Sequence, residues 1–338
     1  MSSLSTGKLP LDLLNDLLSR YAHTDESVLV GPGVGVDAAV VTTSGDLLVA
    51  KSDPITFATD EIGWYAVHVN ANDVACLGAT PRWFLATLLL PEGRTTAKLV
   101  EEIFAQLDAA CRSLNVLLVG GHTEVTYGLD RPIVSGHMLG TVPPEGLITP
   151  AGARPDDRVL IVRGFPIEGT SIIARERADE LRRRGYDEAT IQAAKRFLYE
   201  PGISVVRAAQ VLLESGPVHA LHDPTEGGVA TGLLELALAA GLGIEVEAEA
   251  LPVLPLGQRL CAEFGLDPFG TIASGALLAA VPPNSVSAHL KALEEAGIPA
   301  ADVGQLLPPE RGCWLLVNGE RRPLPRFPAD EITKLFVG

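Results

Sequence analysis

The sequence is poor in basic residues and in cysteine, and it contains no long apolar run. Its 26 lysines and arginines stand against 42 aspartates and glutamates, which leaves a net charge of −16. Because such a chain repels phosphate backbones, nucleic acid is excluded as an expected partner. No stretch of about 18 apolar residues occurs, so no membrane-spanning helix is expected. The first residues lack the basic and apolar segments of a secretory signal.

The four cysteines are too few and too scattered for a disulfide framework or a zinc site. They occur singly and never as a CxxC pair, at Cys76, Cys111, Cys261 and Cys313. Their apolar neighbours indicate buried free thiols. Since free thiols are typical of a reducing compartment, we expect a cytoplasmic protein.

What the sequence does contain is enough apolar material for two folded domains. Hydrophobic residues make up 47% of its 338 residues, and one domain usually takes about 100–200 residues. A connector rich in proline and glycine, residues 142–157, predicts a boundary. We therefore expect domains at 1–150 and 151–338. Strand-like and helical patterns alternate in both, which indicates an α/β (α+β) fold class.

A glycine-rich stretch near the N-terminus, residues 31–41, does not predict a dinucleotide site. Its glycines are spaced GxGxG rather than GxGxxG, and a strand-like segment follows. The segments on either side of Gly45 instead predict a hairpin. In it Asp37 and Asp53 face each other, which destabilises a sheet unless a cation such as Mg²⁺ lies between them. Alternatively, one Asp caps a turn and the other is solvated.

The next predicted helix carries polar side chains on an otherwise apolar face. We expect it to begin at Thr59 or Asp60 and to end at Gly78. On its apolar face lies Asp73, with Asn70 at the border. A carboxylate aimed into a core is costly unless it is paired, hydrogen-bonded or metal-bound. Asp73 is therefore either part of a ligand site or a buried cap of a neighbouring loop.

A predicted buried strand, residues 116–119, runs into a short polar segment, GGHTE. Paired glycines at a strand end let a ligand approach the backbone closely. His122 and Glu124 are candidate catalytic groups, and Glu124 could act as a base or as a metal ligand. The alternative for His122 is a structural role.

The second half contains the segment HDPTEGG, which directly precedes an apolar helix. Gly227 and Gly228 would offer backbone N–H groups at the positive end of that helix, where a phosphate or a carboxylate is favoured. Asp223 and Glu226 could approach a phosphate only through a cation or a proton. A plain N-cap role for the two acids is the alternative.

Six segments, in this order and spacing, resemble the aminoimidazole-ribonucleotide (AIR) synthetase superfamily, with its PurM-like fold. They are GVGVDAAVV, KSDPITF, NANDVACLGATP, GGHTE, HDPTEGG and ASGALLAAVP. The superfamily includes thiamine-monophosphate kinase, selenophosphate synthetase and the hydrogenase maturation protein HypE. DPTEGG and ASGALL are most similar to HypE. The resemblance implies two α/β domains, the first of which pairs its sheet with a second subunit.

The resemblance also implies a homodimer that binds ATP and Mg²⁺ between its domains and acts on a small-molecule substrate. The positions implied to hold metal are Asp37, Asp53 and Asp73. Those implied to line the cofactor pocket are Asn70, Asp73, Gly120, Gly121, Thr123, Asp223, Gly227 and Gly228, and the catalytic candidates are His122, Glu124 and Glu226.

Two departures from the superfamily pattern bear on function. Members often carry an acid where this sequence has Val36, so one metal ligand or one metal is in doubt. HypE ends in a cysteine that carries a carbamoyl group, whereas this sequence ends in KLFVG and its last cysteine, Cys313, is expected to be packed. We therefore expect an ATP-dependent enzyme that phosphorylates an oxygen of a separate small substrate or of an amide-like group. The alternative is an ATP-binding maturation or scaffold protein without turnover.

Overall fold

The structure, a computed structural model, describes residues 13, 25–31, 36, 38–56 and 60–336. They form two compact units, one from residues 25–31 and 38–147 and the other mainly from residues 148–336. Asp37 and Thr59 lie outside the described residues, so their predicted roles stay predictions.

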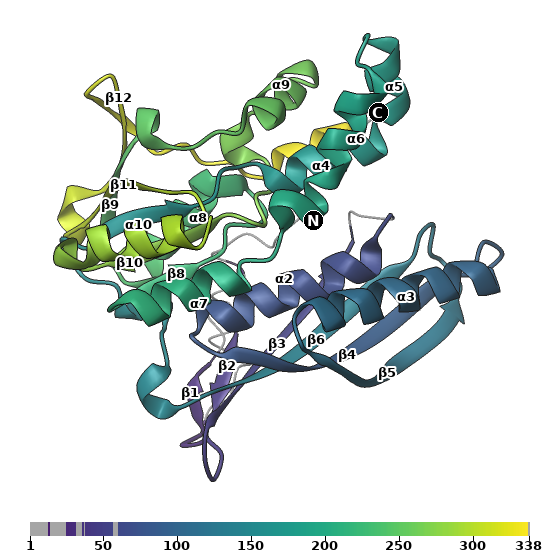
Figure 1. Ribbon diagram of the computed structural model, residues 1–338, viewed down its shortest axis with the longest axis horizontal. Coiled ribbons are helices and arrows are strands. Elements are labelled where there is room, and N and C mark those ends of the chain that lie inside the picture. Colours follow the sequence, from purple (N-terminus) through teal and green to yellow (C-terminus); the bar gives the residue numbers. More distant parts are fainter. Residues whose placement is uncertain (1–12, 14–24, 32–35, 37, 57–59, 337–338) are drawn as a thin grey trace. The chain divides into compact units, whose positions relative to one another are not determined.

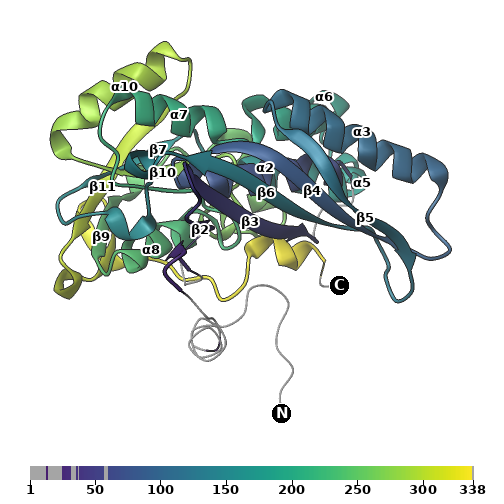
Figure 2. The same cartoon turned by 90° about the horizontal axis from the view of Figure 1, so that it is seen from below.

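The first unit is a sheet with two helices on one face (Figures 1 and 2). Its described strands run in the order β1-β2-β3-β6-β4-β5. They are β1 Val28–Val30, β2 Ala39–Val41, β3 Leu47–Ile55, β4 Thr80–Pro91, β5 Leu117–Thr126 and β6 Ile133–Val142, and the helices are α2 Ile62–Cys76 and α3 Ala97–Ser113. The predicted hairpin is confirmed, because β2 pairs antiparallel with β3. Buried and half-buried residues alternate along β6, as expected for a sheet covered on one face.

Helix α2 lies close against this sheet because two glycines of β6 make room for it. A Cβ at Gly136 would meet Asn70 Nδ2 at 2.4 Å, and a Cβ at Gly140 would meet Val74 at 2.4 Å. Residues four apart in a strand point to the same face, so both glycines face the helix. This close approach brings the polar residues of α2 next to the strands.

Asp60 is not the N-cap of α2, which corrects one of the two predicted starts, whereas the predicted end is confirmed. The helix begins after Glu61, which adopts a left-handed conformation with φ 59° and caps nothing with its side chain. The N–H of Gly63 instead donates to the side chain of Gln106 in α3, at 3.0 Å. A cap supplied by a distant helix leaves no local sequence signal, which is why Asp60 was an attractive but incorrect choice. At the other end Gly78, at φ 79°, terminates the helix.

Strand β5 is the exposed edge of the sheet, which corrects the prediction of a buried strand at residues 116–119. Leu117, Val119 and Val125 are 63%, 53% and 57% exposed. The segment GGHTE lies within this strand rather than after it. At Gly121, with φ 146°, a Cβ would meet the carbonyl oxygen of Ala86 in β4 at 1.9 Å, so only glycine allows the two strands to approach here. An apolar run does not reveal whether its own chain covers it.

The second unit is a mixed sheet with helices on both faces. Its described strands run in the order β13-β12-β9-β11-β7-β10-β8. They are β7 Arg158–Val162, β8 Ala220–His222, β9 Gly243–Glu247, β10 Leu277–Val281, β11 Ala300–Leu307, β12 Cys313–Val317 and β13 Glu320–Pro323. The helices are α4 Ile167–Glu176, α5 Ala178–Arg183, α6 Glu188–Arg196, α7 Val206–Ser215, α8 Gly228–Ala239, α9 Pro255–Glu263 and α10 Val286–Glu295. Figure 2 shows α7 and α10 on one face of this sheet and α8 on the other.

The cysteines of both units are free, as predicted. Burial raises the pKa of Cys111 to about 12 and that of Cys261 to about 11, so neither is a ready thiolate. Cys313 is only half-buried, in β12.

None of the helices in the described part of the chain has the length and apolar character needed to cross a membrane.

Candidate functional site

One cluster of polar side chains lies where β3 faces α2, and a lysine stands at its centre. Lys51 Nζ lies 3.0 Å from Asp73 Oδ2 and 3.5 Å from Asp53 Oδ2. Lys51 and Asp53 are two residues apart in a strand and so share one face. Asp73 reaches them from α2 and is 4% exposed. The structure thus joins the two acids through the ammonium group of Lys51, which the sequence analysis did not single out. Its spacing of two residues from Asp53 in a predicted strand already placed both side chains on one face.

Asn70 completes this cluster from one turn earlier in α2. Its Nδ2 donates to the carbonyl oxygen of Asp53 at 3.2 Å and to that of Ala66 at 2.8 Å. Its Oδ1 is fully buried and accepts no hydrogen bond among the described residues. An unpaired buried oxygen costs about 1–3 kcal/mol, and a ligand that donates a hydrogen bond to it would remove that cost.

The chemistry of these side chains fits a magnesium ion that is bound together with phosphates. Carboxylate and amide oxygens are the ligands that Mg²⁺ prefers, and it commonly takes one or two carboxylates and completes its shell with phosphate and water. Within the described ranges, no group of three or more His, Cys, Asp or Glu could hold a metal by itself. Asp53 and Asp73 are therefore suited to a metal that its phosphate ligand helps to hold.

The polar segment of β5 does not join this cluster within the chain. Strands β6 and β4 lie between β3 and β5, a separation of about 14 Å at roughly 4.8 Å per strand. His122 Nε2 lies 3.2 Å from Glu124 Oε2, and the two side chains are 66% and 49% exposed. Gly120, Gly121, His122 and Thr123 line a groove of about 420 Å³ between β5, β4 and α3. These residues lie on exposed positions of the strand and line this open groove.

In the second unit, the N-terminus of α8 already has a carboxylate. Gly227 and Gly228 have φ of 81° and 66°, and their N–H groups, predicted to be open to a ligand, have partners within the chain. The N–H of Gly227 donates to Asp330 Oδ2 at 2.6 Å, and that of Gly228 donates to the carbonyl of Thr225 at 3.1 Å. The acid that occupies this positive helix end comes from 103 residues further along the chain, so no local pattern could reveal it.

Asp330 joins the segment HDPTEGG, and the residue that directly precedes ASGALLAAVP, to the C-terminal helical turn, Glu331–Leu335. Besides the N–H of Gly227, it accepts from that of Ile272 at 3.2 Å and from that of Ile332 at 2.8 Å. Burial nevertheless raises the pKa of Asp330 to about 6, and the charge of Glu226 acts in the same direction. In the segment that leads to Gly227, Asp223 is buried, at 2% exposure, whereas Glu226 is half-buried.

A carboxyl group absent from the sequence-based candidates, Glu168, lies in the first turn of α4. It is 5% exposed, and its Oε2 accepts no hydrogen bond among the described residues. Burial raises the pKa of Glu168 to about 7, which the nearby Ser274 partly opposes and which Asp330 and Glu226 reinforce. A helix N-terminus favours a carboxylate, so desolvation is the stronger effect here. The sequence did contain a signal for Glu168, because an acidic residue directly precedes the apolar residues of a helix that is expected to be buried.

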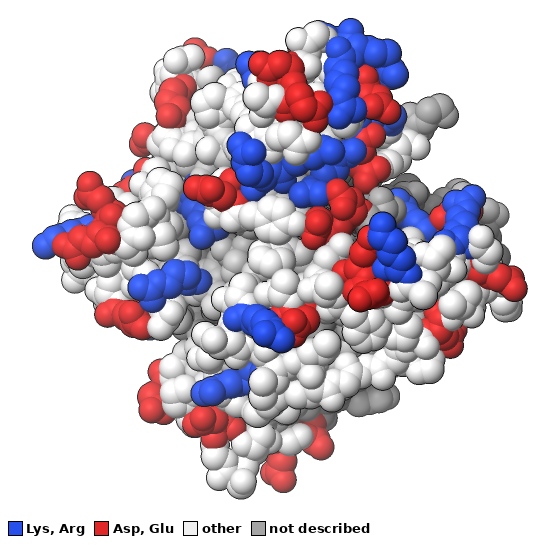
Figure 3. Space-filling view, turned by 45° about the vertical axis from the view of Figure 1, so that its right-hand side comes forward, with Lys and Arg blue, Asp and Glu red and all other residues white. Residues whose placement is uncertain are grey.

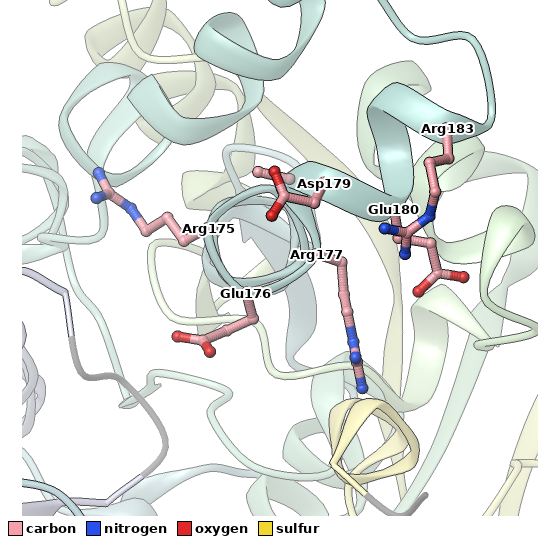
Figure 4. Close-up of a pocket in the computed structure, with 7 residues that line it drawn as sticks. Arg175, Glu176, Arg177, Asp179, Glu180 and Arg183 are labelled. Carbon is pink, nitrogen blue, oxygen red and sulfur yellow. The ribbon is translucent and has the colours of Figure 1, made fainter.

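A pocket of about 270 Å³ in the same unit is an ionic surface network (Figure 4). It is lined by Arg175, Glu176, Arg177, Ala178, Asp179, Glu180 and Arg183. Arg182 lies 2.6 Å from Asp179, and Arg184 lies 2.5 Å from Glu180 and thereby lowers the pKa of that carboxyl. Figure 3 likewise shows basic side chains next to acidic ones on the face displayed. Exposed pairs of this kind contribute little stability.

Comparison with known proteins places the chain in a family. The sequence pattern of the "AIR synthase related protein, N-terminal domain" matches residues 35–142, and that of the "AIR synthase related protein, C-terminal domain" matches residues 154–312. The chain belongs to the AIR synthase related family and has its two-domain α/β PurM-like fold, as the motifs predicted.

Within that family the chain is similar to proteins with enzyme names. It is 32% identical over 263 residues to carbamoyl dehydratase HypE of Cupriavidus necator, covering 76% of this chain and 71% of the relative. It is 28% identical over 331 residues to selenide, water dikinase of Nitratidesulfovibrio vulgaris, covering 87% and 89%. The crystal structure of hydrogenase maturation protein HypE in complex with ATP has a TM-score of 0.71 at 27% identity, covering 97% of this chain and 98% of that one.

Proposed function

We propose that this protein is an ATP- and Mg²⁺-dependent enzyme that phosphorylates an oxygen of a small substrate or of an amide-like group. The observation that carries the proposal is the convergence of Asp53, Asp73 and the unsatisfied Oδ1 of Asn70 around Lys51. Transfer of a γ-phosphoryl group needs positioning and neutralisation of its charge rather than covalent help from the protein. Carboxylate-held Mg²⁺ and a lysine ammonium are suited to both tasks.

The family supports the nucleotide as ATP. A HypE structure of similar fold was determined with ATP, and the dehydratase and dikinase relatives bear the names of enzymes. In this proposal Asp37 joins Asp53 and Asp73 at the metal. Asn70, Gly120, Gly121 and Thr123 line the nucleotide, with Asp223, Gly227 and Gly228 contributed by the second unit. His122, Glu124 and Glu226 take catalytic roles.

Calorimetry with a non-hydrolysable ATP analogue tests the proposal, with and without Mg²⁺. We expect tight binding only with the metal, and binding at least tenfold weaker for Asp53→Asn. Asp302→Asn is the matched control, because Asp302 and its partner Arg158 both lie on strands of the second unit. Equal affinity with and without a chelator would contradict the shared metal. A thermal-shift panel of small amides and alcohols supplies the candidate substrates for a second assay, which measures ADP release. If ATP binds but no ADP is released with any of them, a nucleotide-binding scaffold is favoured instead.

We also propose that the protein acts as a homodimer through its first unit. Three apolar residues of the edge strand β5 and the tyrosine that follows it are at least half exposed: Leu117, Val119, Val125 and Tyr127. Unpaired edges of this length are normally covered. A second copy of β5 would cover these side chains. It could also bring the His122 and Glu124 of a second copy of the chain to the nucleotide, whereas the same residues of one chain lie about 14 Å from β3.

Light scattering tests this assembly. A dimer has about twice the chain mass of 35.6 kDa. Val119→Lys should shift the equilibrium toward monomer and reduce turnover without unfolding the protein. Leu238→Lys is the matched control, since Leu238 is 49% exposed and lies on α8. A wild-type monomer at micromolar concentration would contradict the shared site.

A further inference from the structure

We propose that Lys51 is an exchangeable counter-ion in the first unit. In the absence of metal its ammonium group binds Asp53 and Asp73, and when Mg²⁺ binds these two acids the ammonium group turns to the phosphates of the nucleotide. This inference rests on the proposed function, because it assigns a second role to the lysine of that same site. It uses residues of the first unit alone.

The position of the ammonium group is the position that a shared metal needs. Nζ of Lys51 lies 3.0 Å from Asp73 Oδ2 and 3.5 Å from Asp53 Oδ2, so it bridges the two carboxylates. Mg²⁺ holds oxygen ligands at about 2.0–2.1 Å, so a metal bound to these two oxygens would lie within about 5 Å of Nζ. Like charges at such a distance repel strongly in a partly buried site. The metal and the ammonium group therefore exclude each other.

A resident cation is needed here because Asp73 is buried. Its side chain is 6% exposed, whereas that of Asp53 is 38% exposed. Removing a carboxylate from water is costly unless a cation or a set of donors accompanies it. Lys51 supplies the charge, since strand β3 places it on the same face as Asp53, two residues away. The two acids are thereby held close together before any metal binds.

The chemistry of lysine allows this exchange. Its ammonium group is a compact charge on a flexible four-carbon stem, and it lacks the rigid fork with which arginine binds a carboxylate. The side chain of Lys51 is 18% exposed, and Asp53 is the more exposed of its two partners. Phosphates that share a metal with Asp53 would therefore lie within reach of the displaced ammonium group.

Asn70 provides independent support for a ligand at this place. It is fully buried, and its Oδ1 accepts no hydrogen bond within the described ranges, while its Nδ2 donates to the carbonyl of Asp53 at 3.2 Å. The ammonium group of Lys51 thus leaves this oxygen unsatisfied. Mg²⁺ usually retains several water molecules, and one of these could donate to Oδ1. The metal-bound form would satisfy an acceptor that the lysine-bound form does not.

The exchange couples the binding of metal and nucleotide. Without nucleotide, Mg²⁺ must displace an ammonium group that loses two carboxylates and gains no phosphate. With nucleotide, the phosphates receive the displaced group. Each ligand should therefore raise the affinity for the other by the same factor, and such couplings are typically about 5–150-fold. Removal of the lysine should lower this factor and strengthen the binding of Mg²⁺ alone.

Calorimetric titration of the full chain with MgCl₂, first alone and then with a non-hydrolysable ATP analogue, tests the inference. We expect Lys51→Met to bind Mg²⁺ alone about tenfold more tightly than the wild type, and to show a smaller coupling to the analogue. Lys98→Met is the matched control, because Lys98 is an exposed lysine that pairs with Glu102 on α3 of the same unit. Its affinities should equal those of the wild type. Unchanged or weaker binding of Mg²⁺ alone by a folded Lys51→Met would overturn the inference.

A second variant keeps the inference testable if Lys51→Met does not fold. Lys51→Gln removes the charge but keeps a hydrogen-bond donor for Asp73, and it should show the same gain in affinity for Mg²⁺ alone. If both variants unfold without metal, millimolar Mg²⁺ alone should restore their circular dichroism spectra, and failure to do so would also overturn the inference. No nucleotide takes part in these measurements. The proposed function fails separately, if the wild type binds no ATP analogue in the presence of Mg²⁺.

Discussion

The two units surround their carboxyl groups with opposite charges. In the first unit, Asp53 and Asp73 share the ammonium group of Lys51. In the second, Glu168 and Asp330 are buried near Glu226, and the charges that act on their pKa values are negative. The first site is organised around a positive charge and the second around protons.

The largest expected effect comes from removing the cation of the first site. Lys51→Met leaves Asp73 buried without its ammonium partner, and breaking a buried pair costs about 3 kcal/mol or more. Urea denaturation should show the loss, and Mg²⁺ should restore more stability to the variant than to the wild type. Lys98→Met removes an exposed lysine paired with Glu102 and should change stability by less than about 0.5 kcal/mol. A mild Lys51→Met phenotype would erase the contrast between the units.

The next effect concerns the hydrogen bonds of Asp330. Asp330→Ala leaves the N–H groups of Gly227, Ile272 and Ile332 without their acceptor, at a cost of about 2 kcal/mol. Asp330→Asn keeps an acceptor and should lose less. Hydrogen exchange should locate the loosened amides at the start of α8. Protection there equal to the wild type would contradict the assignment of the cap.

A smaller effect is expected on how the free energy of unfolding depends on pH, and it tests the second site directly. Above neutral pH, removing the carboxyl group of Glu168 should stabilise the protein, whereas the two substitutions above destabilise it. The pKa of Glu168 is raised to about 7, so the folded state retains a proton that the unfolded state releases at its usual pKa of 4.5. Stability contributed by this group is therefore complete below pH 4.5 and is lost as the pH rises through 7. Glu168→Gln removes this ionisation, so its stability advantage over the wild type should be larger at pH 8.5 than at pH 5. Parallel stability curves against pH would show that Glu168 is not the titrating group.

The smallest effect on stability is expected at the exposed pair on β5. Glu124→Gln breaks a contact between side chains that are 66% and 49% exposed, so the free energy of unfolding should change by less than about 0.5 kcal/mol. Turnover should nevertheless fall if Glu124 serves a second subunit. Full activity in a stable Glu124→Gln protein would remove it from the catalytic candidates.

The sequence predicted those features that are carried by local patterns. The hairpin at β2 and β3, the burial of Asp73 on α2, and the glycines that begin α8 all follow from periodicity or turn chemistry. Ordered motifs predicted the family, and the family sets the architecture.

The features that escaped prediction depend on contacts between distant parts of the chain. Gln106 caps α2 from another helix, and Asp330 occupies the N-terminus of α8 from the far end of the second unit. The exposure of β5 escaped because its apolar run matches that of a buried strand. Glu168 escaped because its significance lies in its burial beside Ser274.

The link between Asp330 and Gly227 has a consequence for the order in which the chain is made. A chain emerging during synthesis folds its earlier units first, and here the start of α8 must wait for a residue 103 positions later. Until then a positive helix end lacks its carboxylate, and the cluster that later packs around Ile332 and Leu335 is incomplete. The core of the second unit is therefore complete only once residues 330–335 have been synthesised and have packed against it.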